Sequence, residues 1–173
     1  MRVAGLAALL LLGGCALAPA RSSEPDPAQA EVLSASLQTL RASLPGKLVI
    51  DPRIAAYDVR PGQSWVGTWP WRQAQGFAQV LGGRVAELDE VQECSFPWRG
   101  QTPREQSCVM HDADVHLAVS RPIIRGDEAA VIAYANADHT SASLRESVRV
   151  IHLELRREAG AWAVHSSRVI AAM

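Results

Sequence analysis

The chain has 173 residues, of which 48% are hydrophobic and 20% are charged. This length and composition fit one globular domain with a hydrophobic core and exclude a disordered or collagen-like chain. The 17 basic residues balance 18 acidic ones, for a formal net charge of −1. Nucleic-acid-binding proteins usually carry a basic surplus, because they displace counterions from phosphate, so we expect no nucleic-acid partner.

The first residues have the pattern of an export signal. Arg2 precedes an apolar run from Val3 to Leu12. This run is too short to cross the roughly 30 Å hydrocarbon core of a bilayer, since a helix needs about 20 residues for that. A positive charge followed by a short apolar run is typical of a signal peptide. We therefore expect residues 1–14 to be a signal peptide.

The end of that segment, Leu12-Gly13-Gly14-Cys15, resembles the lipobox of bacterial lipoproteins. The resemblance implies that Cys15 is lipidated on its sulfur and becomes the first residue after cleavage. Acyl chains contribute about 0.8 kcal/mol per buried methylene and hold such a protein on a membrane. In such lipoproteins the residue after the lipidated cysteine helps to sort the protein between membranes. Here that residue is Ala16 rather than Asp, which implies the outer membrane of a Gram-negative cell, facing the periplasm. The alternative is an incidental cysteine beside an ordinary cleavage site at Ala18-Pro19-Ala20.

The segment after Cys15 is predicted to lead through a tether into a helix. Residues 16–30 are rich in Pro, Ser and Ala, which is typical of a flexible linker before a single domain over residues 31–173. A first helix is predicted from about Pro27 to Leu44, with Asp26 as its N-cap. It places one apolar stripe on one face, formed by Leu33, Leu37, Leu40 and Leu44.

The middle of the chain gives weaker patterns. Leu48–Ile50 predicts a short edge strand, and residues 55–71 are interpreted as a loop because their periodicity is weak. A second helix is predicted from about Pro70 to Leu81, ended by Gly82-Gly83. Residues 84–88 predict another short strand.

Cys94 and Cys108 form an even pair once Cys15 carries lipid. Outside the cytoplasm such a pair predicts a disulfide bond. Closing a loop of about 15 residues stabilises a fold by roughly 3 kcal/mol in the chain-entropy model. The alternative, a redox-active pair, lacks the Cys-x-x-Cys spacing that lowers a thiol pKa.

After Cys108 the pattern changes to strands with a period of two. Turns are predicted at Arg125–Glu128 and Glu158–Gly160. Between and beyond them, strands are predicted over residues 115–119, 129–135, 147–156 and 162–170. The pattern predicts an antiparallel meander covered by the two helices, which is an α+β fold.

Two hairpin sequences carry a resemblance to a known family. They are Gly160-Ala161-Trp162-Ala163-Val164 and Arg125-Gly126-Asp127-Glu128-Ala129. With the element order of residues 27–173, they resemble the NTF2-like (SnoaL-like) superfamily. The resemblance implies an α+β cone, with two N-terminal helices packed on a curved antiparallel sheet. That superfamily includes isomerases, dehydratases, ligand carriers and non-catalytic modules, so the fold does not decide function. Its enzymes place an Asp/His or Tyr/Asp pair inside the cone, which cannot be matched here residue by residue.

The segment His111–His116 contains four possible metal ligands in six residues. On a strand, Asp112, Asp114 and His116 would share one face, and His152 or His165 could complete a Zn²⁺ site. The alternative is that these polar side chains face solvent beside the cysteine loop. We favour the alternative and expect no metal site.

Three histidines and a tyrosine are candidates for ligand binding. If the polar faces of the strands line the cone, His116, His152 and His165 could converge with Tyr134 as acid–base groups. Histidines on strands are otherwise solvent-facing or satisfied core residues. No Gly-x-Gly-x-x-Gly, Walker or His-Glu-x-x-His motif occurs. We therefore expect no cofactor and assign no catalytic residue.

Four tryptophans gather in the middle of the chain: Trp65, Trp69, Trp71 and Trp98. Such rings are enriched in ligand pockets and partner interfaces, where they could stack on a sugar or an apolar ligand. The alternative is that they cap the open end of the sheet.

These patterns predict a lipid-anchored envelope protein that binds an envelope protein or a small apolar ligand and catalyses no reaction. The first alternative is an NTF2-like enzyme with acid–base chemistry in its cone. The second is an envelope-assembly scaffold, which would show a large exposed apolar patch and no pocket.

Overall fold

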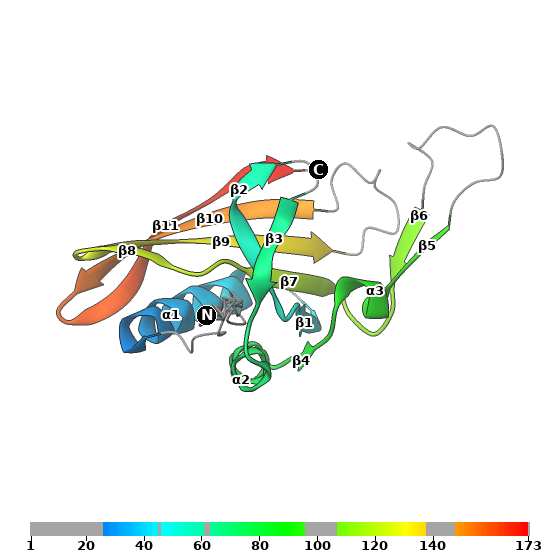
Figure 1. Cartoon of the computed structure of the whole chain (residues 1–173), viewed down its shortest axis with the longest axis horizontal. Helices are drawn as coiled ribbons and strands as arrows, with labels where there is room; N and C mark the ends of the chain where they lie inside the picture. The colour runs from blue at the N-terminus through cyan, green and yellow to red at the C-terminus, as the bar shows by residue number, and fades with distance from the viewer. Residues whose placement is uncertain (1–25, 45, 61–62, 96–106, 138–147, 173) are drawn as a thin grey trace, which may run out of the picture.

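The computed structural model describes residues 26–44, 46–60, 63–95, 107–137 and 148–172. They confirm an α+β fold (Figure 1). The helices are α1 (Pro27–Ser43), α2 (Trp71–Leu81) and α3 (Leu88–Val91). The strands are β1 (Leu48–Ile50), β2 (Arg53–Arg60), β3 (Gln63–Thr68), β4 (Arg84–Val85), β5 (Gln92–Ser95), β6 (Ser107–Met110), β7 (Val115–Val119), β8 (Ile123–Arg125), β9 (Glu128–Ala137), β10 (Val148–Glu158) and β11 (Ala161–Ala172).

Part of what the sequence predicts lies outside the described residues. This holds for the signal peptide, for Cys15 and for Trp98. The helix α1 begins at Pro27, so the last residues assigned to the tether are helical. No helix among the described residues is both long enough and apolar enough to cross a bilayer.

The main sheet contains the predicted meander, but it is mixed rather than antiparallel. Its strands follow the order β11-β10-β9-β7-β1-β4, and β8 pairs with β9 beside this path. The four strands β7, β9, β10 and β11 are antiparallel as predicted. However, β1 pairs in parallel with both β7 and β4. It is therefore an internal strand and not an edge. All three of its residues are buried, which is typical of a strand covered on both faces.

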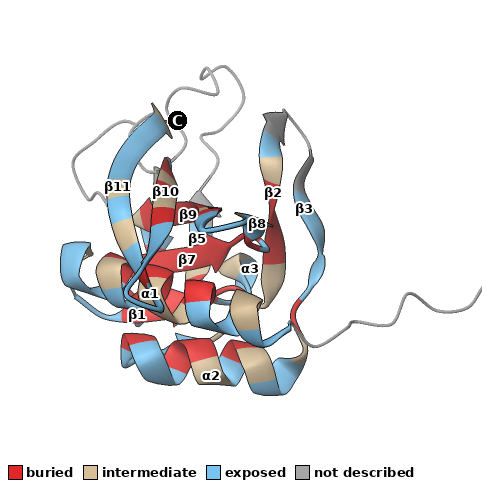
Figure 2. Cartoon of the chain, turned by 90° about the vertical axis from the view of Figure 1, so that its left-hand side faces the viewer, coloured by how far each residue is buried: buried red, intermediate tan, exposed pale blue. Residues whose placement is uncertain are grey.

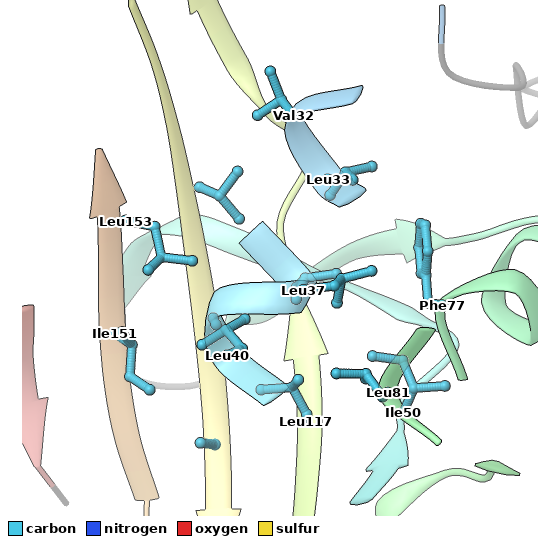
Figure 3. Close-up of a cluster of buried hydrophobic side chains, with 14 of the residues drawn as sticks. Val32, Leu33, Leu37, Leu40, Ile50, Phe77, Leu81, Leu117, Ile151 and Leu153 are labelled. Carbon is cyan, nitrogen blue, oxygen red and sulfur yellow. The ribbon is translucent and has the colours of Figure 1, made fainter. Parts of the chain in front are cut away.

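The helix α1 packs on one face of the meander through its leucine stripe. Leu33, Leu37 and Leu40 are buried in the main core, together with Leu117 of β7 and Leu153 of β10 (Figure 3). The side chain of Asp26 accepts a hydrogen bond of 2.8 Å from the Gln29 amide and caps the helix, as predicted. Each fully buried leucine contributes roughly 1.5–3 kcal/mol, so this stripe supplies a large share of the fold's stability.

The second helix is confirmed, but it does not lie over the antiparallel strands. It ends at Gly82, whose φ of 66° is left-handed, and it packs against α1, β1 and β4. The two helices therefore cover different parts of the sheet: α1 packs on the antiparallel strands β9, β10 and β11, whereas α2 packs on β1 and β4, which pair in parallel. The predicted strand over residues 84–88 is limited to Arg84–Val85, and α3 begins at Leu88.

The predicted loop over residues 55–71 is wrong. Its residues form most of a two-stranded antiparallel ribbon of β2 and β3, here called the β2–β3 ribbon. Ala55 and Tyr57 of β2 pack in a second core cluster with Ala118, Ile132, Tyr134 and Val150 of the meander. These meander residues share the face opposite α1, because they alternate with the residues that contact α1. The sheet is thus covered by α1 on one face and by the β2–β3 ribbon on the other.

Candidate functional site

A cavity of about 430 Å³ lies beside the β2–β3 ribbon, and we call it the Tyr57 cavity. It is lined by Tyr57, Ile123, Arg125, Glu128, Ala129, Ala130, His152, Glu154, Leu155, Arg156 and His165. Figure 2 shows β2 and β3 on one side and β10 and β11 on the other, with β8 and β9 between them. The volume falls in the range of small-molecule sites, roughly 300–1,000 Å³.

The strand period places the polar groups of β10 in this cavity. Ile151, Leu153 and Leu155 belong to the core under α1, so His152 and Glu154 point to the opposite face. Glu154 lies opposite the small residue Ala130 of β9. A small side chain at that position leaves room above the sheet, which is why the cavity forms there.

A β-bulge brings His165 to the same cavity. Leu155 pairs with Val164 and Glu154 pairs with Ser166, so His165 is the extra residue between two paired positions. Bulges of this kind redirect a side chain and often occur next to sites. Strict alternation from the sequence gives no sign of the bulge.

Two residues that line the cavity carry a buried polar atom that is unpaired among the described residues. The hydroxyl oxygen of Tyr57 and Nδ1 of His152 have no hydrogen-bond partner among the described residues. Their rings meet edge to face, with centroids 6.3 Å apart. An unpaired buried donor or acceptor costs about 1–3 kcal/mol. A ligand that bonded to both atoms would recover that cost.

The hydroxyl of Tyr57 is a hydrogen-bond donor at neutral pH. Burial raises the pKa of Tyr57 to about 12, with a further rise from the Glu154 carboxylate and a smaller opposing effect from Arg125. The phenol therefore keeps its proton.

Most charges around the Tyr57 cavity are paired. Glu154 accepts hydrogen bonds from Ser166 Oγ at 3.0 Å and from Arg168 Nη2 at 3.3 Å. The Oε1 atom of Glu154 also lies 3.5 Å from His152 Nδ1 without forming a hydrogen bond. Arg156 Nη2 lies 3.7 Å from Glu128 Oε1. The cavity thus combines a hydrogen-bond donor, the Tyr57 hydroxyl, with the Glu154 carboxylate, which already accepts hydrogen bonds from Ser166 and Arg168.

The structure brings together two of the four histidine and tyrosine candidates. His152 and His165 both line the Tyr57 cavity. Tyr134 lies on the face of the sheet that also carries His152, but its hydroxyl donates a hydrogen bond of 3.2 Å to the Ala56 carbonyl oxygen. Burial raises the pKa of Tyr134. The fourth candidate, His116, belongs to a separate buried cluster.

That cluster joins His116 of β7 to Asp51 and Arg53. Asp51 is fully buried, and Arg53 contacts it through Nε at 2.9 Å and Nη2 at 2.6 Å. His116 Nε2 lies 3.4 Å from Asp51 Oδ2 and 3.2 Å from the Ala86 carbonyl oxygen. Burial lowers the pKa of His116, and the Asp51 carboxylate partly offsets this. These contacts fix the start of β2 on the sheet, a role for Asp51 that the sequence analysis did not predict.

The tryptophans do not form one surface. Trp69 is a core residue that packs edge to face on Phe77, with centroids 5.2 Å apart. Trp65 is partly exposed and lies under the Arg53 guanidinium, whose Cζ is 4.3 Å from the ring centroid. Trp71 is 58% exposed at the start of α2 and lines a separate shallow pocket. Neither Trp65, Trp69 nor Trp71 lines the Tyr57 cavity.

The side chains of His111–His116 contact different partners. Asp114 accepts a hydrogen bond of 2.7 Å from the Lys47 amide, and His111 Nε2 lies 3.1 Å from Glu93 Oε2. Asp112 occupies a left-handed turn with a φ of 57°. Within the described ranges, no group of three or more His, Cys, Asp or Glu residues could hold a metal ion.

The two cysteines of the predicted disulfide belong to a short ribbon. The register of β5 and β6 places the backbone of Cys94 opposite that of Cys108. The side chains of both cysteines lie outside those that the structure describes. The bond therefore stays a prediction.

No protein-family model, no curated protein and no solved structure matches this chain.

Proposed function

We propose that this protein is a lipid-anchored module of the cell envelope that binds a small ligand in the Tyr57 cavity and catalyses no reaction. The observation that carries the binding role is the pair of buried, unpaired polar atoms, the Tyr57 hydroxyl and His152 Nδ1. Their residues line a cavity of about 430 Å³. Buried polar groups in native proteins are nearly always bonded, so a ligand that supplied the missing partner would account for this pair.

The anchoring role rests on the sequence. The lipobox-like Leu12-Gly13-Gly14-Cys15 lies shortly before the start of α1 at Pro27. A tether of this length would hold the folded domain close to the membrane surface. The outer membrane, facing the periplasm, is the location implied by Ala16.

The likeness to the NTF2-like superfamily remains part of this proposal. The β10–β11 hairpin and the turn between β8 and β9 support it, because they carry the two motif-like sequences. In that superfamily the enzymes use titratable pairs inside the cone. Here the sheet face under α1 is packed with Leu33, Leu37 and Leu40. The polar cavity lies on the other face, which favours a binding module over an enzyme of that type.

A second candidate function is acid–base catalysis in the Tyr57 cavity. One observation favours it: His152 Nδ1 lies 3.5 Å from Glu154 Oε1, the arrangement of a base and the group that orients it. Against it, Glu154 is already bonded to Ser166 and Arg168. A catalytic pair needs a shared substrate atom within about 3 Å of both groups.

Native mass spectrometry of the full-length protein extracted from its own membrane tests the binding role. Ala130→Trp fills the cavity, and Ala30→Trp places the same side chain on an exposed position of α1. We expect a retained small molecule in the wild type and in Ala30→Trp, but none in Ala130→Trp. A wild type without a retained molecule, or an Ala130→Trp variant that keeps it, would contradict the proposal. Chemical conversion of the released molecule by fresh protein would favour the enzyme.

A further inference from the structure

We propose that the ligand of the Tyr57 cavity is a small organic anion, whose carboxylate or similar oxyanion binds Arg125 and Tyr57 and whose apolar part packs on Ile123. This inference rests on the proposed binding function and names the chemical class of its ligand.

Among the residues that the structure describes, charge pairing leaves Arg125 at the cavity without an ion-pair partner. Glu128 is the register partner of Arg125, but its carboxylate lies 3.7 Å from Arg156 Nη2. The second carboxylate, that of Glu154, is bonded to Arg168 at 3.3 Å. Arg125 itself makes no ion pair within the described part of the chain. The local balance therefore favours a bound negative charge.

The unpaired groups also need an acceptor. The Tyr57 hydroxyl can donate a proton, and the Arg125 guanidinium has five N–H donors and no acceptor. The carboxylates in the cavity wall are those of Glu128, which lies near Arg156, and of Glu154, which already accepts hydrogen bonds from Ser166 and Arg168. An oxyanion brings two acceptor oxygens, which guanidinium and hydroxyl groups bind more strongly than a neutral carbonyl.

The remaining wall of the cavity is apolar. Ile123 is 41% exposed on β8, and Ala130 and the ring of Tyr57 line the same space. An exposed isoleucine next to a polar cavity is a surface that an apolar group of the ligand would cover. The matching ligand therefore has an anionic end and a small hydrocarbon or aromatic body.

Isothermal titration calorimetry of the full-length protein in detergent tests whether the ligand is an anion. It uses three probes of similar shape. The probes are benzoate, benzamide and benzylamine, which carry a negative, a neutral and a positive head group. We expect benzoate to bind about tenfold or more tightly than benzamide, and benzylamine to bind weakest. Arg125→Gln should remove the preference for benzoate, while Arg156→Gln, whose charge is paired with Glu128, should keep it.

The outcomes separate the ligand class from the binding function. Equal affinity for benzoate and benzamide, or an unchanged preference in Arg125→Gln, would overturn the anion proposal and leave the cavity as a binding site. Arg125 is exposed, so its replacement should not affect folding, and far-UV circular dichroism checks this. If no probe binds, the anion proposal is overturned. The binding function then falls only if native mass spectrometry also finds no molecule retained by the wild type.

Discussion

The phenol of Tyr57 stands edge-on to the imidazole of His152, with ring centroids 6.3 Å apart and ring planes at 89°. Tyr57 comes from the β2–β3 ribbon and His152 from the middle of the meander. Neither ring uses its polar atom toward the other, since the Tyr57 hydroxyl and His152 Nδ1 are both unpaired among the described groups. Both residues line the cavity, and their two polar atoms are buried in its wall without a partner among the described groups.

Replacing Tyr57 by Phe should separate stability from binding. The ligand-free protein should gain up to about 1 kcal/mol in its free energy of unfolding, because a buried unpaired hydroxyl is removed. Affinity for both benzoate and benzamide should fall, since each can accept the lost hydrogen bond. Urea denaturation and titration calorimetry measure the two effects.

The matched control is Tyr134→Phe. The Tyr134 hydroxyl donates to the Ala56 carbonyl, so its loss should lower the free energy of unfolding by about 1 kcal/mol. A Tyr57→Phe variant that is destabilised as much as Tyr134→Phe would show that the Tyr57 hydroxyl is bonded in the free protein.

Stability should fall as the pH is lowered through the titration range of His116. Burial lowers the pKa of His116, with an additional lowering by Arg53 and opposing contributions from Asp51, the Ala86 carbonyl and Asp89. The unfolded chain, with a histidine pKa near 6.5, then binds more protons than the native state. The stabilising contribution is complete above about pH 6.5 and is lost as the pH falls toward the native pKa.

The variant His116→Gln keeps a donor for the Ala86 carbonyl and cannot be protonated. We expect a smaller fall in its free energy of unfolding between pH 7.5 and pH 5.5 than in the wild type, measured by urea denaturation. The exposed position His165→Gln serves as the comparison and should keep the wild-type fall. Identical pH dependence of the wild type and His116→Gln would refute this assignment.

The facing positions of Cys94 and Cys108 predict a disulfide bond in the exported protein. Alkylation of the denatured, unreduced protein followed by mass spectrometry should find neither thiol labelled. Replacing both by Ala should lower the free energy of unfolding by roughly 3 kcal/mol, the value for closing a loop of about 15 residues. Labelling of both cysteines in protein isolated from the envelope would contradict the bond.

Lipid attachment at Cys15 should be visible in cells that export the full chain. Metabolic labelling with a clickable palmitate should mark the wild type and leave Cys15→Ser unmarked. Cys94→Ser should still be marked, since the lipobox-like residues precede Cys15 alone. An unmarked wild type would remove the membrane anchor from the account.

The strongly periodic parts of the fold could be predicted from the sequence. The spacing of Leu33, Leu37 and Leu40 identified α1, and the period-two segments identified the strands of the meander. The β2–β3 ribbon escaped prediction because Ile54, Ala55 and Ala56 are all buried and so hide the alternation of a strand. The dipeptide Pro61-Gly62 within this segment is also typical of a turn or loop.

The candidate site could be predicted only in part, since it depends on contacts between distant segments. The alternation of β10 placed His152 on the face away from Leu153. Nothing in the local sequence of Tyr57 or Arg125 indicates that both line the cavity with His152. The bulge at His165 is likewise set by pairing with β10. The cavity depends on the packing of the β2–β3 ribbon beside the sheet, and the bulge depends on the pairing of β11 with β10.

The location of a bound molecule tests the central claim most directly. A crystal structure of the protein extracted with its retained molecule should show that molecule between β2 and β10, within hydrogen-bond distance of the Tyr57 hydroxyl and His152 Nδ1. A molecule bound elsewhere, for example against the exposed ring of Trp71, with the Tyr57 cavity holding solvent alone, would contradict the account.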